Sequence, residues 1–123
     1  MFKRIDHVAL QVVDAAAAAS FYIETFGFKK VFDAVGTGGR SIIYIQLGDG
    51  MIELTQRDKA EPMSGFHLCL QPDDFDAAMT RLRACGLPVV TDAQPTSPRG
   101  PLEAGWRRAV FLGPHGELIE IRG

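Results

Sequence analysis

The sequence predicts an α+β fold of two tandem βαβββ modules. Three observations predict it. The chain has 123 residues, enough for one domain with a sizeable core. Its two halves repeat one another. Each half alternates between the apolar period of a strand and that of a helix. We therefore expect a single domain made of two repeats, over about 1–58 and 64–123.

Composition narrows the class of protein. Hydrophobic residues make up 46% and charged residues 23%, which is typical of globular chains and excludes wholesale disorder. A net charge of −2 argues against a nucleic-acid partner. No apolar run approaches the roughly 20 residues of a membrane span, and the first residues lack the apolar core of a signal peptide. Two cysteines are too few for a disulfide framework. We expect a cytoplasmic protein that binds neither nucleic acid nor a membrane.

The internal repeat places the same residue types at matched positions. The segment around His7 (IDHVALQ) aligns with that around His67 (GFHLCLQ) at an offset of 60 residues. Further along, LGDGMIEL aligns with LGPHGELIEI, so that Glu53 corresponds to Glu120. Each half thus carries an early histidine and a late glutamate.

In the first half, the pattern predicts one strand, one helix and three further strands. Asp14 suits the N-cap of a helix over 15–26, and Gly27 ends that helix. Glycine-rich turns separate the later strands. The strands are expected at 5–13, 28–35, 40–47 and 50–57.

The second half repeats this order, with Asp73 or Asp74 capping a helix that runs to Cys85. Its buried stripe is expected to be Phe75, Ala78, Met79 and Leu82. Strands are expected at 65–71, 87–92, 106–112 and 117–122.

The connection from Asp92 to Gly105 is long, with 14 residues that include three prolines and two glycines. It fits a surface insertion, and equally a lid that brings Arg99 to an anionic substrate.

Alternation along the strands puts the four repeated residues on the faces away from the helices. His7 shares a face with Gln11, and His67 shares one with Cys69. If the sheets curl, all four faces line one cup. Two imidazoles and two carboxylates suit one divalent ion of nickel, zinc, iron, manganese or cobalt, and they balance its charge. A single histidine in a strand is more often a core residue than a metal ligand. The hypothesis of a metal site therefore depends on the matched placement of all four residues.

Three residues are assigned structural roles. His115, which has no repeat partner, is predicted to be an exposed turn residue. Cys69 is expected to form a small buried wall of the cup and is also a candidate substrate contact. Cys85 is expected to pack within the second helix.

Several motifs together resemble the vicinal-oxygen-chelate superfamily, which includes glyoxalase I, methylmalonyl-CoA epimerase, extradiol dioxygenases, and the fosfomycin and bleomycin resistance proteins. The resemblance covers nearly the whole chain and agrees with the predicted cup. It is carried by DHVAL at 6–10, FY at 21–22, FGF at 26–28, GMIEL at 50–54, GFHL at 65–68 and FLGPHGELIEI at 111–121.

The order His, Glu, His, Glu is similar to that of glyoxalase I, the lactoylglutathione lyase. That likeness implies the metal ligands His7, Glu53, His67 and Glu120. It also implies lyase or isomerase chemistry, with proton transfer next to a carbonyl through a metal-stabilised enediolate. Glu53 and Glu120 would then be the catalytic acid and base, in an order the sequence leaves open.

Two alternatives stay open beside this prediction. An oxygenase or a fosfomycin-type thiol transferase would use only His7, His67 and Glu120. A non-catalytic protein that sequesters a drug-like ligand would use an apolar cup, to which Trp106, Phe28 and Phe32 are candidate contributors.

The resemblance also bears on substrate and assembly. Gln11 stands where lyases acting on glutathione adducts usually carry arginine, which counts against glutathione. The family pattern implies a homodimer, a substrate with adjacent oxygens, and mixed sheets that curl into a metal-binding cup. The sequence leaves open whether this cup closes within one chain or across the dimer. The candidate substrate-binding residues are Gln11, Cys69, Arg99 and Arg122.

Overall fold

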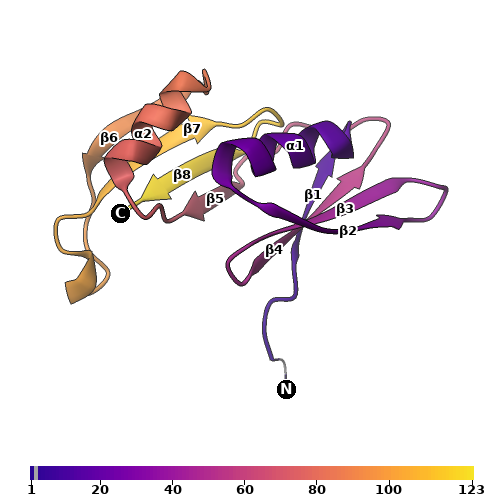
Figure 1. The fold of residues 1–123 in the computed structure, drawn as a ribbon, viewed down its shortest axis with the longest axis horizontal. Coiled ribbons are helices and arrows are strands. Elements are labelled where there is room, and N and C mark those ends of the chain that lie inside the picture. The colour runs from indigo at the N-terminus through magenta and orange to yellow at the C-terminus, as the bar shows by residue number, and fades with distance from the viewer. Residues whose placement is uncertain (2) are drawn as a thin grey trace. The chain divides into compact units, whose positions relative to one another are not determined.

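A computed structural model describes residue 1 and residues 3–123, and it divides into two compact units, Met1–Glu61 and Pro62–Gly123. Each unit contains a four-stranded mixed sheet and one α-helix in the order βαβββ (Figure 1). The predicted α+β fold of two tandem modules is confirmed. No helix among the described residues has the length and apolar character that crossing a bilayer requires.

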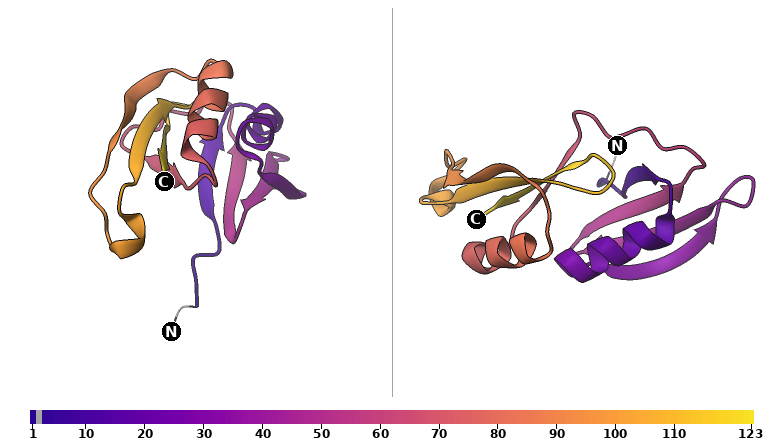
Figure 2. Two further views of the ribbon diagram at one scale, coloured as in Figure 1. Left: turned by 60° about the vertical axis from the view of Figure 1, so that its left-hand side comes forward. Right: turned by 90° about the horizontal axis from the view of Figure 1, so that it is seen from above.

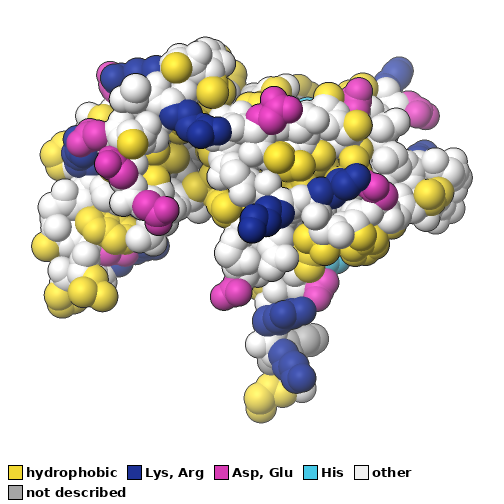
Figure 3. All heavy atoms as spheres, viewed as in Figure 1, with side chains coloured by type: hydrophobic (Ala, Val, Ile, Leu, Met, Phe, Trp, Pro, Cys, Tyr) yellow, Lys and Arg dark blue, Asp and Glu magenta, His cyan; other side chains and the backbone are white. Residues whose placement is uncertain are grey.

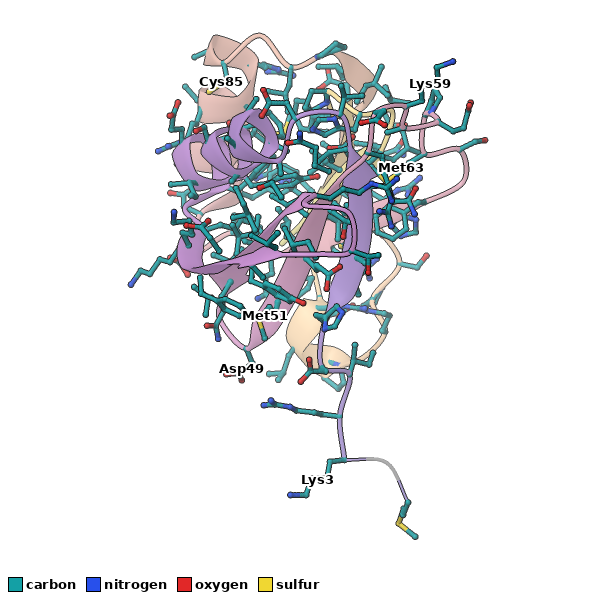
Figure 4. All side chains as sticks on the ribbon, turned by 90° about the vertical axis from the view of Figure 1, so that its right-hand side faces the viewer. Lys3, Asp49, Met51, Lys59, Met63 and Cys85 are labelled. Carbon is teal, nitrogen blue, oxygen red and sulfur yellow. The ribbon has the colours of Figure 1, made fainter. Side chains whose placement is uncertain are left out.

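The first unit has the strand order β1-β4-β3-β2, in which β1 runs parallel to β4 and the other neighbours are antiparallel. The helix lies along one face of this sheet (Figure 2). The β3–β4 turn carries Asp49 at its tip, and Met51 follows on β4 (Figure 4). The elements are β1 (Val8–Val12), α1 (Ala15–Phe26), β2 (Lys29–Val35), β3 (Ser41–Leu47) and β4 (Gly50–Gln56).

Helix α1 begins and ends where the sequence predicts. The Asp14 side chain accepts a hydrogen bond from the Ala17 backbone N–H at 2.9 Å, which satisfies one of the free donors of the first turn. Gly27 ends the helix in the left-handed region, with φ of 79°. Tyr22 is fully buried on the sheet-facing side, together with the strand residues Leu10 and Leu54.

The second unit repeats this topology, with the strand order β5-β8-β7-β6 and β5 parallel to β8. Asp74 caps α2 by accepting from Ala77 N–H at 3.0 Å. Arg107 fastens the helix to β7: its guanidinium lies 4.5 Å from the centre of the Phe75 ring. The elements are β5 (His67–Leu70), α2 (Phe75–Ala84), β6 (Val89–Pro95), the 3₁₀ helix η1 (Pro101–Glu103), β7 (Arg107–Leu112) and β8 (Leu118–Arg122).

Strand β6 runs further than predicted. It continues past residue 92 to Pro95, which pairs with Arg107, so the irregular connection is shorter than the expected 92–105 segment. The proline is tolerated because β6 is an edge strand, whose outward N–H groups need no ladder partner.

The structural roles predicted for His115 and Cys85 are wrong, as is the burial predicted for Cys69, described below. His115 is half-buried, because its carbonyl accepts from Met63 N–H at 3.2 Å and the chain before β5 therefore covers the turn. Cys85 is exposed as the C-cap of α2, at the end of the helix (Figure 4).

The turn between β7 and β8 encloses a charged residue that the sequence patterns did not single out. Glu117 is fully buried, and its carboxylate folds back to accept from the His115 backbone N–H at 2.8 Å. The side chain fills the space in which a Cβ on Gly113 would lie. Glycine at 113 therefore makes room for Glu117.

Replacing Gly113 by alanine should lower the free energy of unfolding by about 2 kcal/mol, because the added methyl overlaps the Glu117 carboxyl group. Urea unfolding measures this. Gly100→Ala is the matched control, since its Cβ would meet nothing within 4 Å, and it should change stability by less than about 0.5 kcal/mol. Equal effects of the two changes would contradict the steric explanation.

Candidate functional site

In each unit, a parallel strand pair brings a histidine beside a glutamate. The register of β1 on β4 sets Ala9 opposite Glu53, and His7 lies two residues earlier. His7 Nε2 is 3.3 Å from Glu53 Oε2. These two side chains lie on one side of the sheet, as the alternation predicts.

The second unit has the same arrangement. Cys69 lies opposite Glu120, and His67 lies two residues earlier. His67 Nε2 is 3.8 Å from Glu120 Oε2. The structure thus brings the predicted ligands together as two pairs, one in each unit. Over residue 1 and residues 3–123, no three His, Cys, Asp or Glu side chains form a group that could hold a metal ion.

Glu53 is held in place by hydroxyl groups. Tyr44 Oη donates to its carboxylate at 2.5 Å, and Thr55 Oγ1 donates at 2.6 Å. The hydrogen bond from Thr55, followed by that from Tyr44, lowers the pKa of Glu53. The same bond to Glu53 raises the pKa of Tyr44. The carboxylate is therefore ionised and fixed in one orientation.

His7 is oriented by a carboxylate on its other side. Its Nδ1 lies 2.9 Å from Asp6 Oδ2, and this hydrogen bond lowers the pKa of Asp6. If Nδ1 carries the proton, the lone pair of Nε2 faces Glu53. Carboxylate–histidine pairs of this kind orient imidazole ligands in metal sites. The donor chemistry of the first unit therefore fits a divalent ion.

Aromatic rings border the first pair. Tyr44 stacks on Phe32, with ring centres 4.6 Å apart, and meets the His7 ring edge-on at 5.6 Å. Phe32 remains 50% exposed and presents one ring face to solvent, whereas Phe28 is buried in the core.

The second pair has different neighbours. Arg108 Nη1 lies 3.8 Å from Glu120 Oε1, too far for a hydrogen bond. Cys69 was expected to be a buried wall but is an exposed residue, because β5 is an edge strand. Partial desolvation of its sulfur and the nearby Glu120 carboxylate raise the pKa of the thiol, so it stays protonated at neutral pH.

The other predicted substrate-binding residues separate into two kinds. Gln11 is exposed on β1, and Arg99 is exposed on the loop before η1. Arg122 is largely enclosed: it donates to Ser97 O at 2.8 Å and to Glu103 Oε2 at 2.8 Å.

Glu103 links the loop that carries Arg99 to Arg122 on β8 through hydrogen bonds. Its carboxylate also accepts from the Arg99 backbone N–H and from Arg99 Nε, each at 2.8 Å. The bonds from Arg99 and then from Arg122 lower the pKa of Glu103 to about 2. Arg122 therefore anchors the loop, and Arg99 packs along it instead of extending freely.

Sequence patterns alone missed several of these contacts. Tyr44 was not singled out, although a two-residue turn pairing Leu47 with Gly50 fixes its place opposite Glu53. Glu103 carried no signal, because it lies in an irregular segment, and Arg108 on β7 was not singled out because the repeat offers no counterpart for it.

Charged side chains of both signs are intermingled on the face shown in Figure 3. Two βαβββ units, each joining a histidine to a glutamate, define a class of small α+β proteins suited to binding small molecules. A sequence model of the Glyoxalase/Bleomycin resistance protein/Dioxygenase superfamily matches residues 4–121. The chain belongs to this superfamily, whose members bind small molecules.

Curated relatives extend over almost the whole chain. The uncharacterized protein YwbC of Bacillus subtilis is 32% identical over 98% of both chains. The ethylmalonyl-CoA/methylmalonyl-CoA epimerase of Cereibacter sphaeroides is 30% identical, again over 98% of both. The named relatives are thus epimerases, and the likeness is not specific to glyoxalase I.

Solved structures share the fold. SMU.1112c superimposes with a TM-score of 0.79 at 21% identity over the whole of both chains. TnmS3, an antibiotic-binding protein from Streptomyces sp. CB03234, gives 0.74 at 28% identity, covering 98% of this chain and 94% of its own. The FosX E126Q variant from Listeria monocytogenes, solved with Mn(II), gives 0.72 at 18% identity, with coverage of 98% and 92%.

Changing Tyr44 to phenylalanine should raise the pKa of Glu53, because it removes one of the two hydroxyl donors and keeps the ring. Because the Glu53 pKa is lower in the folded state than in the unfolded state, the ionised carboxylate stabilises the fold at pH values above its unfolded-state pKa. This stabilisation is lost as the pH falls through the folded-state pKa. The variant should therefore be less stable by about 1 kcal/mol at neutral pH, and the difference should shrink in acid. On metal-free protein, NMR titration of the carboxyl carbon measures the Glu53 pKa, and urea unfolding at several pH values measures the free energy of unfolding. An unchanged Glu53 pKa would contradict the prediction.

Changing Glu103 to glutamine should release the loop, because it weakens the bonds to Arg99 and Arg122. Trypsin should then cut after Arg99 about tenfold faster than in the wild type, since cleavage follows the open population. Glu61→Gln, at an exposed position, makes the same change of charge and serves as control. Equal cleavage rates in the wild type and in Glu103→Gln would show that Glu103 does not hold the loop.

Proposed function

We propose that this protein is a metal-dependent enzyme that moves a proton at the carbon next to a carbonyl group. One observation carries the proposal: the same His–Glu pair occurs at the same strand positions in both units, with separations of 3.3 and 3.8 Å. Independent surface charges would not be expected to fall into this repeated pattern. The epimerase relatives support the reaction class.

The proposed ligands are His7, Glu53, His67 and Glu120, two from each unit. Their two nitrogens and two carboxylates fit a divalent ion such as nickel, zinc, iron, manganese or cobalt. A bound ion would supply Lewis-acid stabilisation of negative charge on a substrate oxygen. The proposal requires both pairs at one ion, either within a chain or across a homodimer.

The surroundings of the two glutamates suggest different roles. Two hydroxyl groups hold Glu53 and lower its pKa, which suits a fixed ligand and makes a poor proton acceptor. The neighbours of Glu120, His67 and Arg108, both lie 3.8 Å away, so neither holds its carboxylate by a hydrogen bond. We assign proton abstraction to Glu120 and the role of fixed ligand to Glu53, and the proton that Glu120 takes returns from Glu120 to the substrate carbon.

The substrate we favour is an acyl thioester that loses a proton beside its carbonyl, as the names of the epimerase relatives indicate for those proteins. A lactoylglutathione-lyase-like reaction uses the same proton transfer. Gln11 counts against it, because an amide does not neutralise a glutathione carboxylate as arginine does.

A second candidate is a binding protein that sequesters an aromatic ligand without turnover. The half-exposed Phe32 ring, stacked on Tyr44, offers a stacking surface. The likeness to the antibiotic-binding TnmS3 supports this alternative. Such a protein would bind ligand stoichiometrically whether or not metal is present.

Metal analysis by elemental mass spectrometry tests the site. We expect about one transition ion per chain in the wild type and loss of the ion in the double variant His7→Ala/Glu53→Ala. His115→Ala is the matched control, because His115 lies outside both pairs. Retention of the ion in the double variant would refute the ligand assignment.

Proton exchange tests the reaction. In D₂O the metal-loaded protein should exchange the proton on the carbon between carbonyl and carboxylate of methylmalonyl-CoA. Glu120→Gln should slow this exchange by about 10² to 10⁴ while keeping at least part of the metal. NMR measures the exchange, and a wild-type rate in Glu120→Gln would refute the assigned role.

A further inference from the structure

The two units differ in the side chains that neighbour their matched glutamates. In the first unit, Tyr44 lies opposite Glu53 on β3, and Thr55 follows two positions later on β4. Both side chains donate hydroxyl groups to Glu53. The hydrogen-bond donors to this glutamate are thus two neutral hydroxyl groups.

In the second unit, the corresponding positions carry Val110 opposite Glu120, and Arg122 two positions later. Arg108 lies directly opposite Arg122 on β7. Register partners share one face of a sheet, so both guanidinium groups lie on the face of Glu120. Two like charges directly opposite each other are unfavourable unless each finds a partner.

The two arginines differ in how they are neutralised. Arg122 has a side chain 12% exposed and is paired with Glu103 at 2.8 Å. Arg108 is 38% exposed, and its ion pair within the described residues is with Glu120, at 3.8 Å. That separation is too long for a hydrogen bond. Arg108 is therefore an accessible guanidinium with donors to spare.

We infer that Arg108 is a substrate-binding residue that pairs with a carboxylate carried by the substrate beside the carbon that loses its proton. The inference rests on the proposed function, because Arg108 Nη1 lies 3.8 Å from Glu120, the carboxylate to which we assign proton abstraction. A planar guanidinium pairs with a planar carboxylate through two parallel hydrogen bonds, whereas an ammonium cannot. A substrate lacking that carboxylate would leave Arg108 unpaired, so this residue selects among substrates.

A calorimetric titration of malonate into metal-loaded protein tests the inference. Malonate is the probe because it carries two carboxylates on one carbon. Arg108→Gln should weaken malonate binding about tenfold to hundredfold, the usual effect of losing a charged hydrogen-bonded pair. Arg108→Lys should recover only part of the affinity. Arg40→Gln, in the β2–β3 turn, makes the same change of charge and should bind like the wild type.

Two further measurements, of folding and of phosphate binding, complete the test. Circular dichroism confirms that each variant is folded, and Arg108→Lys preserves the charge if Arg108→Gln does not fold. Phosphate as a second probe, bound as tightly as malonate and equally sensitive to Arg108, would overturn carboxylate recognition. So would malonate binding that is absent in the wild type or unchanged in both Arg108 variants.

Metal content, measured on the same samples, separates this inference from the proposed function. Wild-type protein that holds its ion but shows no dependence of malonate binding on Arg108 overturns the inference alone. Wild-type protein that takes up no ion overturns the proposed function. Loss of malonate affinity in Arg108→Gln, with metal content equal to that of the wild type, supports both.

Discussion

The parallel pairing between the first and last strands of each unit is the constraint on which the site depends. It joins segments distant in the chain, and a shift of one residue in its register would turn every side chain of the strand to the other face. The register that buries Leu54 beneath α1 is therefore also the one that places Glu53 beside His7. Core packing and the placement of this His–Glu pair are therefore set by one strand register.

Much of this arrangement is readable from the sequence, because it depends on local rules and on duplication. Asp14 and Gly27 bound α1 through a cap and a left-handed glycine, which depend on single residues. The two-residue turn between β3 and β4 fixes the pairing of Tyr44 with Glu53. The repeat extends the same inference to the second unit, where His67 and Glu120 meet as His7 and Glu53 do.

The rest depends on side chains that meet across irregular segments, for which no periodicity exists. The place of Arg122 against Glu103 follows from how the loop folds back over the end of β8. The burial of Glu117 follows from the space that Gly113 leaves open. Charged residues are usually at the surface, so composition alone does not predict the burial of Glu117 or the enclosure of Arg122. Each of these side chains is enclosed only because specific hydrogen-bond partners surround it.

The two units keep the same backbone pairing but give their matched glutamates different surroundings. The backbone pairing keeps a glutamate at the same position in each sheet, and the residues opposite and two positions away define its environment. Tyr44 and Thr55 supply short hydrogen bonds that fix Glu53 in its ionised form. Around Glu120, Val110 lies opposite on β7 and Arg108 Nη1 is 3.8 Å away, so neither supplies such a bond. Under the proposed function, Glu53 is thereby suited to holding an ion and Glu120 to taking and returning a proton.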